Sequence, residues 1–257
     1  MPELAFKPDG GLGNILFMHH AAYSYAKDHN LNLCAVGDYP TPETRPPFSF
    51  YKKLFSHVKI VTGLTHPIWT DPILCHYTPI PVGAASLTGF YQSYKYFQKY
   101  QWEIRDLLRR NESDLWNEKV KKFKKISGEK STVCVHIRRG DYLQPGIHRC
   151  IPEDYYTQSL SKFKEHKIIV FSDGLDEVKT WKIWKDQDVV FIEDEPGALE
   201  TLFLMSLCNH FVIANSTLSL MAYYMREHIN GTIIAPSSWF NTGGPSVNMA
   251  DLIDKSI

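Results

Sequence analysis

Short apolar runs alternate with stretches of helical periodicity throughout the second half of the chain, from about residue 132 onward. The runs are rich in Val, Ile and Phe and bounded by polar residues, which is typical of buried strands. We therefore predict strands at 132–138, 168–171, 189–192, 211–214 and 232–235 and helices at 152–165, 175–184, 198–209 and about 217–228. Strands that alternate with helices in this way predict a parallel, doubly wound α/β sheet.

The first half is less regular but begins in the same way. A strand at 4–7, a glycine-rich loop and a helix at about 14–29 are followed by strands at 31–36, 58–61 and 86–91 and helices at about 98–110 and 114–126. The rest of 55–83 and the proline-rich segment 38–47 are predicted to be loops. A polar run at 127–130 resembles a linker, so we predict two domains, 1–127 and 128–257.

Polar side chains follow four consecutive strands of the second half, at 138–141, 172–173, 193–195 and 215–217. Because the carboxyl ends of parallel strands share one edge of a sheet, and ligands of open α/β sheets bind there, these residues predict a binding site. Arg138 and Arg139 suit an anion, since the guanidinium fork matches phosphate oxygens, and Asp141 can hold one fork in place. The alternative is an Arg–Asp pair on the surface, but the position after a buried strand favours a site.

The strand that precedes these arginines has two different faces. Alternation places Val133, Val135 and Ile137 on one face and Cys134 and His136 on the other. His136 is either a core histidine or part of the site, and its position two residues before the first arginine favours the site.

A second candidate anion site lies near the N-terminus, where Gly10, Gly11 and Gly13 precede the first predicted helix. A strand, a glycine-rich loop and a helix start form a phosphate-binding arrangement, because backbone N–H groups can approach an anion closely. The signal is weak by itself, since it is not a full GxGxxG motif and many Gly–Gly turns bind nothing. Asn14 can either cap the helix or contact a ligand.

Composition narrows the class of protein. The 257 residues are 44% hydrophobic and 22% charged, as in soluble globular proteins, and the formal net charge of zero argues against a nucleic-acid-binding surface. Residues 1–10 lack the apolar core of a signal peptide, and no apolar run has the length of a membrane span. The five cysteines lack CxxC spacing and are expected to be reduced thiols, so we predict a cytoplasmic location without a membrane span.

Other chemistries have less support in the sequence. Asp186 and Asp188 form a DxD pair, but they precede a strand and should lie exposed at the opposite edge of the sheet, without a metal. The histidines lack metal-ligand spacing, and neither a GxSxG elbow nor a Walker motif is present.

The segment 136–142, HIRRGDY, resembles the HxRRGDY motif of glycosyltransferase family 11, the α-1,2-fucosyltransferases; a looser HxRRxD form is shared with α-1,6- and protein O-fucosyltransferases. Segments 10–14, 89–97, 171–173 and 214–219 resemble further motifs of the family in the same order. The sequence departs from the family at Ile15, at Gly174, and at Leu220 and Met221, which replace a glutamine, an aspartate and two tryptophans. These changes concern acceptor choice more than donor binding.

The resemblance implies a GT-B-like α/β fold with two Rossmann-like domains facing a cleft, and GDP-fucose held mainly by the C-terminal domain. The donor-binding residues that it implies are Gly11, Gly13, Asn14, His136, Arg138, Asp173, Asn215, Ser216 and Thr217. Arg138 would bind the β-phosphate, and His136 and Asp173 the guanosine. The alternative for Asp173 is that it caps the next helix. Tyr91 and Gln92 are candidates for the acceptor side.

The implied reaction is an inverting, metal-independent transfer of fucose to a galactose hydroxyl of a β-galactoside glycan in α-1,2 linkage, without a cofactor. Arg138 would stabilise the departing GDP in place of a metal, and Asp141 is a second catalytic candidate. The general base is not assigned; Asp141, Glu153, Asp154 and His148 are candidates. Two alternatives remain open: a non-catalytic nucleotide- or glycan-binding module on the same fold, and a transferase for another purine-nucleotide sugar.

Overall fold

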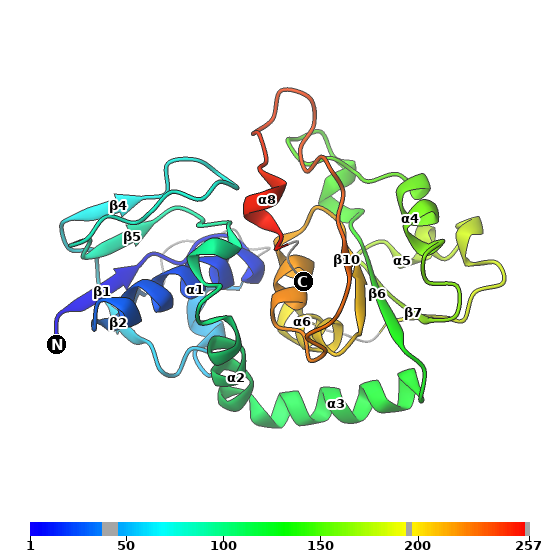
Figure 1. Ribbon diagram of the computed structural model, residues 1–257, viewed down its shortest axis with the longest axis horizontal. Coiled ribbons are helices and arrows are strands. Elements are labelled where there is room, and N and C mark those ends of the chain that lie inside the picture. Colours follow the sequence, from blue (N-terminus) through cyan, green and yellow to red (C-terminus); the bar gives the residue numbers. More distant parts are fainter. Residues whose placement is uncertain (38–45, 194–196, 255–257) are drawn as a thin grey trace. The chain divides into compact units, whose positions relative to one another are not determined.

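The computed structural model describes residues 1–37, 46–193 and 197–254 (Figure 1). The chain divides into two compact units, one formed by Met1–Ser113 together with Ser246–Ser256 and the other by Asp114–Pro245. The C-terminal segment therefore belongs to the first unit, a return of the chain that no sequence pattern indicated. Most of the loop predicted at 38–47 lies outside the described residues.

The first unit contains, within its described residues, a five-stranded sheet in the order β3-β2-β1-β5-β4. All of its strand pairs are parallel. Its strands and helices are β1 (Glu3–Phe6), α1 (Leu12–Asp28), β2 (Asn32–Val36), β3 (Lys59–Val61), β4 (Ile68–Thr70), β5 (Ser86–Thr88), α2 (Gln101–Asn111) and α8 (Met249–Leu252). β2 and β3 are added on one side of β1, and β5 and β4 lie on its other side. The strand order therefore switches between β1 and β5.

The second unit contains, within the described part of the chain, another five-stranded parallel sheet, in the order β10-β9-β6-β7-β8. The long helix α3 (Ser113–Ser127) leads into it. Its other elements are β6 (Thr132–Ile137), α4 (Glu153–Leu160), β7 (Lys167–Ser172), α5 (Leu175–Val178), β8 (Val189–Phe191), α6 (Ala198–Ser206), β9 (His210–Val212), α7 (Thr217–Tyr224) and β10 (Ile233–Ile234). The predicted alternation of strands and helices is thus confirmed, and the strand order switches between β6 and β9.

The two faces of β6 pack as its alternation predicted. Val133, Val135 and Ile137 join one hydrophobic core with Tyr156 and Leu160 of α4. The opposite face carries Cys134 and His136, and α6 and α7 are themselves largely buried. Burying both faces of the sheet explains why these strands are continuous apolar runs rather than alternating ones.

Several predicted boundaries were wrong. The segment 55–83 contains β4, which was predicted to be loop; it is a short edge strand with Ile68 exposed, so it lacks an apolar pattern. The helix predicted at 175–184 breaks after α5, because Trp184 turns inward and its Nε1 donates to the carbonyl of Val178 at 2.7 Å. The helix predicted at 152–165 ends at Leu160.

No helix within the described residues is long and apolar enough to cross a membrane. All five cysteines are free thiols, and Cys34, Cys75, Cys134 and Cys208 are buried.

Candidate functional site

The loops after β6 and β9 lie at the point where the strand order of the second sheet reverses. Neighbouring loops diverge there, which is why open α/β sheets bind ligands at this position. Arg138, Arg139 and Asp141 follow β6, and Asn215, Ser216 and Thr217 follow β9. The fold therefore brings two of the predicted polar clusters to the site that its topology favours.

The guanidinium of Arg138 is held on three sides. Its Nη1 lies 2.9 Å from Oδ2 of Asp173, and its Nη2 donates to Asp141. Its central carbon lies 4.9 Å from the centroid of the Tyr142 ring. The side chain is 28% exposed, so the fork is oriented before any ligand arrives and can still be reached by one. The predicted contact of Asp141 with an arginine is confirmed.

Asp173 ties the loop after β7 to the loop after β6. Its Oδ1 accepts the backbone N–H of Arg139 at 2.7 Å, while Oδ2 pairs with Arg138. The carboxylate thus contacts the arginines rather than capping α5, whose N-cap residue is Gly174, and the capping alternative was wrong. Gly140 permits this approach, because a Cβ at that position would lie 2.5 Å from Oδ2 of Asp173.

Arg139 points toward a different carboxylate. Its Nε and Nη2 donate to the two oxygens of Glu177, and its Nη1 lies 2.9 Å from the sulfur of Cys150. A Cβ on Gly174 would lie 2.7 Å from Cβ of Arg139, so glycine is needed there too. The sequence predicted that the two arginines form one anion receptor. In the structure they have different partners: Arg138 contacts Asp173 and Asp141, and Arg139 contacts Glu177.

His136 is buried, with 4% of its surface exposed, and Nδ1 has no hydrogen-bond partner among the described residues. Burial and the charge of Arg138 lower the pKa of this imidazole to about 3, so it is neutral at physiological pH. Buried polar atoms are nearly always hydrogen-bonded, so an unpartnered nitrogen near the carboxyl end of β6 is a position where a ligand can supply the partner.

Asn215 has the same property at the end of β9. Its Nδ2 donates to the carbonyls of Arg149 and Trp239 at 2.9 and 2.5 Å, whereas Oδ1 has no partner within the described residues. Ser216 is the N-cap residue of α7 and Thr217 its first residue. The first N–H groups of a helix lack intrahelical acceptors, so this end of α7 can bind negative charge.

Tyr142 joins these loops, although its role was not predicted. Its ring lies against Arg138, and its hydroxyl donates to the carbonyl of Asn215 at 3.1 Å. Burial raises the pKa of the phenol to about 12. The ring of His148 stacks on it at 4.7 Å and 7°. The sequence could have indicated Tyr142 as a site residue, because it is the last residue of the HIRRGDY segment. Nothing in the sequence indicated Glu177 beyond its position on a predicted helix.

The first unit brings its own predicted residues together at the switch between β1 and β5. Asn14, near the start of α1, does not cap that helix, whose N-cap residue is Gly11. Its Oδ1 instead accepts a hydrogen bond from Nε2 of Gln92 at 3.0 Å. Gly13 is buried in the first turn of α1. Tyr91 is 1% exposed, and its hydroxyl donates to the carbonyl of Trp69 at 3.0 Å.

Asp186 and Asp188 lie at the opposite edge of the second sheet and are exposed, as predicted, with Asp188 paired to Lys130 at 2.6 Å. Among the described residues, no three His, Cys, Asp or Glu side chains form a group that could hold a metal ion.

Solved structures with this fold define its class. The chain resembles POFUT1 in complex with GDP, with a TM-score of 0.55 and 16% identity over 92% of this chain and 98% of the other. It also resembles the α-1,6-fucosyltransferase NodZ soaked with GDP-fucose, with a TM-score of 0.54 and 14% identity over 95% and 97% of the two chains. The predicted GT-B class of the fold is therefore confirmed.

Sequence similarity gives the family. Residues 77–245 match glycosyl transferase family 11, and the chain belongs to that family. It is 30% identical to an α-1,2-colitosyltransferase of Escherichia coli over 169 residues, which are 62% of this chain and 57% of that protein. It is 31% identical to the Escherichia coli O-antigen biosynthesis glycosyltransferase WbnK over 131 residues, 46% of this chain and 42% of that protein. The chain thus covers about half the length of these relatives.

Proposed function

We propose that this chain transfers fucose from GDP-fucose to a galactose hydroxyl of a β-galactoside glycan, in α-1,2 linkage and with inversion at the sugar carbon. The observation that carries the proposal is the environment of Arg138. This arginine of the family motif is oriented by two carboxylates and an aromatic ring at the switch point of the second sheet. A departing GDP needs positive charge fixed in place before the reaction, and Arg138 fits that role.

In this proposal the diphosphate binds between Arg138 and the start of α7. Arg138 contacts the β-phosphate, and the N–H groups and hydroxyls of Ser216 and Thr217 donate to the phosphate oxygens. The unpartnered atoms of His136 and Asn215 then gain partners from the nucleotide or the sugar. Gly11, Gly13 and Asn14 remain predicted donor contacts.

The two carboxylates on Arg138 have different roles. Asp173 is anchored twice, to Arg138 and to the backbone of Arg139, so it stays in place. Asp141 is 64% exposed and only three residues from its partner, and exposed pairs of this kind contribute little. A diphosphate can therefore replace Asp141 on the fork, which frees its carboxylate beside the reacting sugar as a candidate base.

Asp173 is also the proposed guanine contact, and this assignment has its own test. A carboxylate can accept hydrogen bonds from the N1–H and amino group of guanine, which adenine lacks as a pair. Replacing Asp173 by alanine should therefore weaken GDP binding and reduce the preference for GDP over ADP in competition calorimetry. If the variant binds GDP more weakly but keeps the full preference, Asp173 only orients the arginines.

The proposed acceptor side is Tyr91 and Gln92 in the first unit. Both side chains have partners within the first unit: Nε2 of Gln92 donates to Asn14, and the hydroxyl of Tyr91 donates to the carbonyl of Trp69. His148, stacked on Tyr142, is a second candidate for the base.

A second candidate donor carries colitose, because the relative with 30% identity is an α-1,2-colitosyltransferase. Colitose differs from fucose by one missing hydroxyl, and a site that hydrogen-bonds this hydroxyl rejects the sugar that lacks it. Parallel assays with the GDP derivatives of both sugars, the same acceptor and equal concentrations distinguish the two.

The test of the proposal is incubation of the purified chain with radiolabelled GDP-fucose and a panel of β-galactosides. We expect a labelled product with an α-1,2 linkage by NMR. If the chain hydrolyses or transfers the sugar only from a different purine-nucleotide sugar, that compound is the donor and GDP-fucose is not. Tight GDP binding without any transfer would support the non-catalytic module instead.

A further inference from the structure

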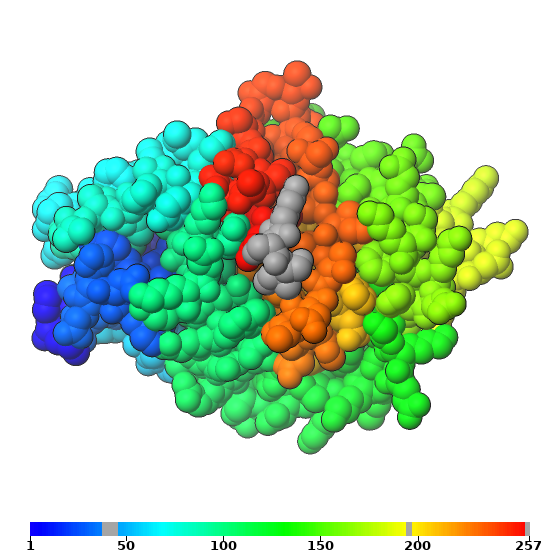
Figure 2. Space-filling model, viewed as in Figure 1, coloured from blue at the N-terminus to red at the C-terminus, as the bar shows by residue number. Residues whose placement is uncertain are grey.

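The last described residues form a short strap on the first unit. Residues 246–254, here called the C-terminal strap, contain α8 and belong to the same compact unit as β1–β5. In Figure 2 the red atoms of this segment lie directly against the cyan-green atoms of the first unit. The strap follows the last residue that matches the family.

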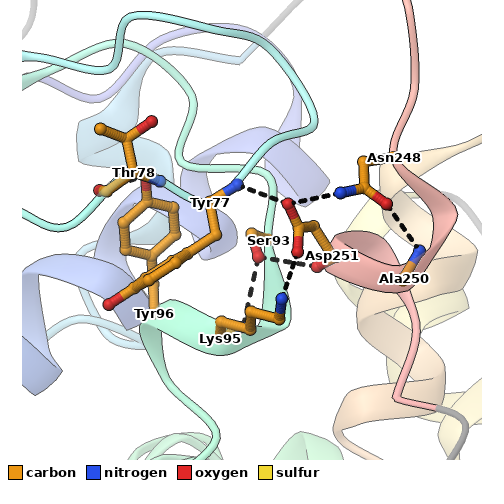
Figure 3. A network of polar contacts seen from close by, with 8 residues as sticks. All are labelled: Tyr77, Thr78, Ser93, Lys95, Tyr96, Asn248, Ala250 and Asp251. Atoms are coloured by element: carbon orange, nitrogen blue, oxygen red, sulfur yellow. Dashed lines mark hydrogen bonds and ion pairs between the residues drawn. The ribbon is translucent and has the colours of Figure 1, made fainter.

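Asp251 is the centre of the contacts made by the strap (Figure 3). Its Oδ2 accepts hydrogen bonds from the backbone N–H of Tyr77 and from Nδ2 of Asn248, both at 2.9 Å, and its Oδ1 pairs with Lys95 at 2.5 Å. Its side chain is 8% exposed. Asn248 lies in the strap itself, but Tyr77 and Lys95 do not, and both would lose this buried partner if the strap opened.

The backbone of the strap adds two further contacts. The hydroxyl of Ser93 donates to the carbonyl of Asp251 at 2.7 Å, and the N–H of Asn248 donates to the carbonyl of Cys75 at 3.4 Å. The strap thus holds two separate segments of the first unit, one around Cys75–Tyr77 and one around Ser93–Lys95.

These two segments converge on Gln92. The thiol of Cys75 donates to Oε1 of Gln92 at 3.2 Å, and Nε2 of Gln92 donates to Asn14 at 3.0 Å. Gln92 is 6% exposed, so its rotamer is set by these neighbours. A continuous series of contacts therefore runs from the strap, through Ser93 and Cys75, to the residue that follows the glycine-rich loop.

We propose that Asp251 is a positioning residue, and that the closed strap fixes Gln92 for binding of the acceptor. The kinetic part rests on the proposed function, in which Gln92 lies on the acceptor side. The structural part, closure of the strap over Cys75, does not rest on it.

Thiol labelling tests the structural part without any substrate. Cys75 is completely buried, and burial raises the pKa of its thiol to about 12, so it should resist a maleimide while the strap is closed. In Asp251→Ala and in the milder Lys95→Met we expect Cys75 to label at least about fivefold faster, with the modified peptide identified by mass spectrometry. Cys34, buried in the first unit, and Cys134 and Cys208, buried in the second, should stay protected and so exclude general unfolding of either unit.

The matched control is Asp28→Ala, which removes a carboxylate of the same unit that pairs with Lys99 and not with the strap. This variant should label like the unmodified protein. Equal protection of Cys75 in all variants would overturn the proposal, as would equal exposure of every cysteine, because the strap would then stabilise the fold as a whole.

Kinetics then separate positioning from stability. In Asp251→Ala we expect the KM for the galactoside to rise about tenfold with kcat changed much less, and Asp251→Glu to restore part of the loss. An unchanged acceptor KM in a variant with an exposed Cys75 would refute the positioning role. If the unmodified chain transfers no sugar at all, the proposed function fails, and the labelling result still decides whether the strap closes.

Discussion

Replacement of Arg138 by lysine tests the proposed leaving-group contact most directly. In the structure two nitrogens of the guanidinium serve two different carboxylates, those of Asp173 and Asp141, while the ring of Tyr142 supports its face. A lysine keeps one positive charge but has a single ammonium group, so it cannot reproduce the planar fork or its stacking.

The expected magnitude follows from the contact that is lost. Removing one donor to charge that develops in the transition state costs about 2.7–4 kcal/mol, which is a factor of about 10²–10³ in kcat. Because the ground-state diphosphate also loses one of its bonds, the Kd for GDP should rise by about tenfold, equivalent to about 1.4 kcal/mol. The rate should therefore fall more than the affinity.

The assay combines initial rates over a range of GDP-fucose concentrations with calorimetry of GDP and a thermal melt. Arg110→Lys, an exposed site on α2, is the matched control and should behave like the unmodified protein. The kcat/KM of Arg139→Lys should lie between those of these two variants. The fork of Arg139 contacts Glu177 and so orients a loop, whereas it does not contact the leaving group. If Arg138→Lys keeps most of its kcat/KM with an unchanged melting temperature, Arg138 is not the leaving-group contact.

Three other predictions can be checked with the same protein. Gly140→Ala should lower kcat/KM by at least about tenfold, because its Cβ would displace the Asp173 carboxylate from Arg138; full activity would mean that this pair is dispensable. Activity should survive EDTA, whereas a complete and magnesium-reversible loss would require a metal in the mechanism. Burial lowers the pKa of His19 and, to about 3, that of His20, so both are neutral in the folded state. Since the unfolded chain takes up protons below about pH 6.5, stability should fall as the pH falls from 6.5 toward 4, by up to about 1.4 kcal/mol per pH unit for each histidine. His20→Gln should flatten this dependence in melts at several pH values, and an unchanged slope would contradict the assignment.

The strands that are buried on both faces of a sheet could be predicted from the sequence. Strands such as β6 and β7 are buried on both faces and therefore appear in the sequence as continuous apolar runs. β4 could not be predicted, because an exposed edge strand owes its conformation to pairing with β5 and not to its own pattern. Likewise, the break after α5 depends on the inward turn of Trp184, which helical periodicity does not encode.

The candidate site was predicted as a set of residues but not as a set of contacts. The sequence placed Arg138, Asp173 and Asn215 after three of the four consecutive strands that end in polar residues, and parallel topology requires such loops to share one edge. It did not show that Arg138 and Arg139 point to different carboxylates, since side-chain direction depends on the neighbouring loops.

The sequence by itself determined the alternation of strands and helices, the edge at which polar residues gather, and the motif that links the chain to its family, because each of these is local in the chain. Only the tertiary structure decided which groups meet. Gln92 bonds to a residue 78 positions away, and Ser93 bonds to the strap 158 positions away. Such contacts have no local signature, because they depend on the packing of whole elements and on the return of the C-terminus to the first unit.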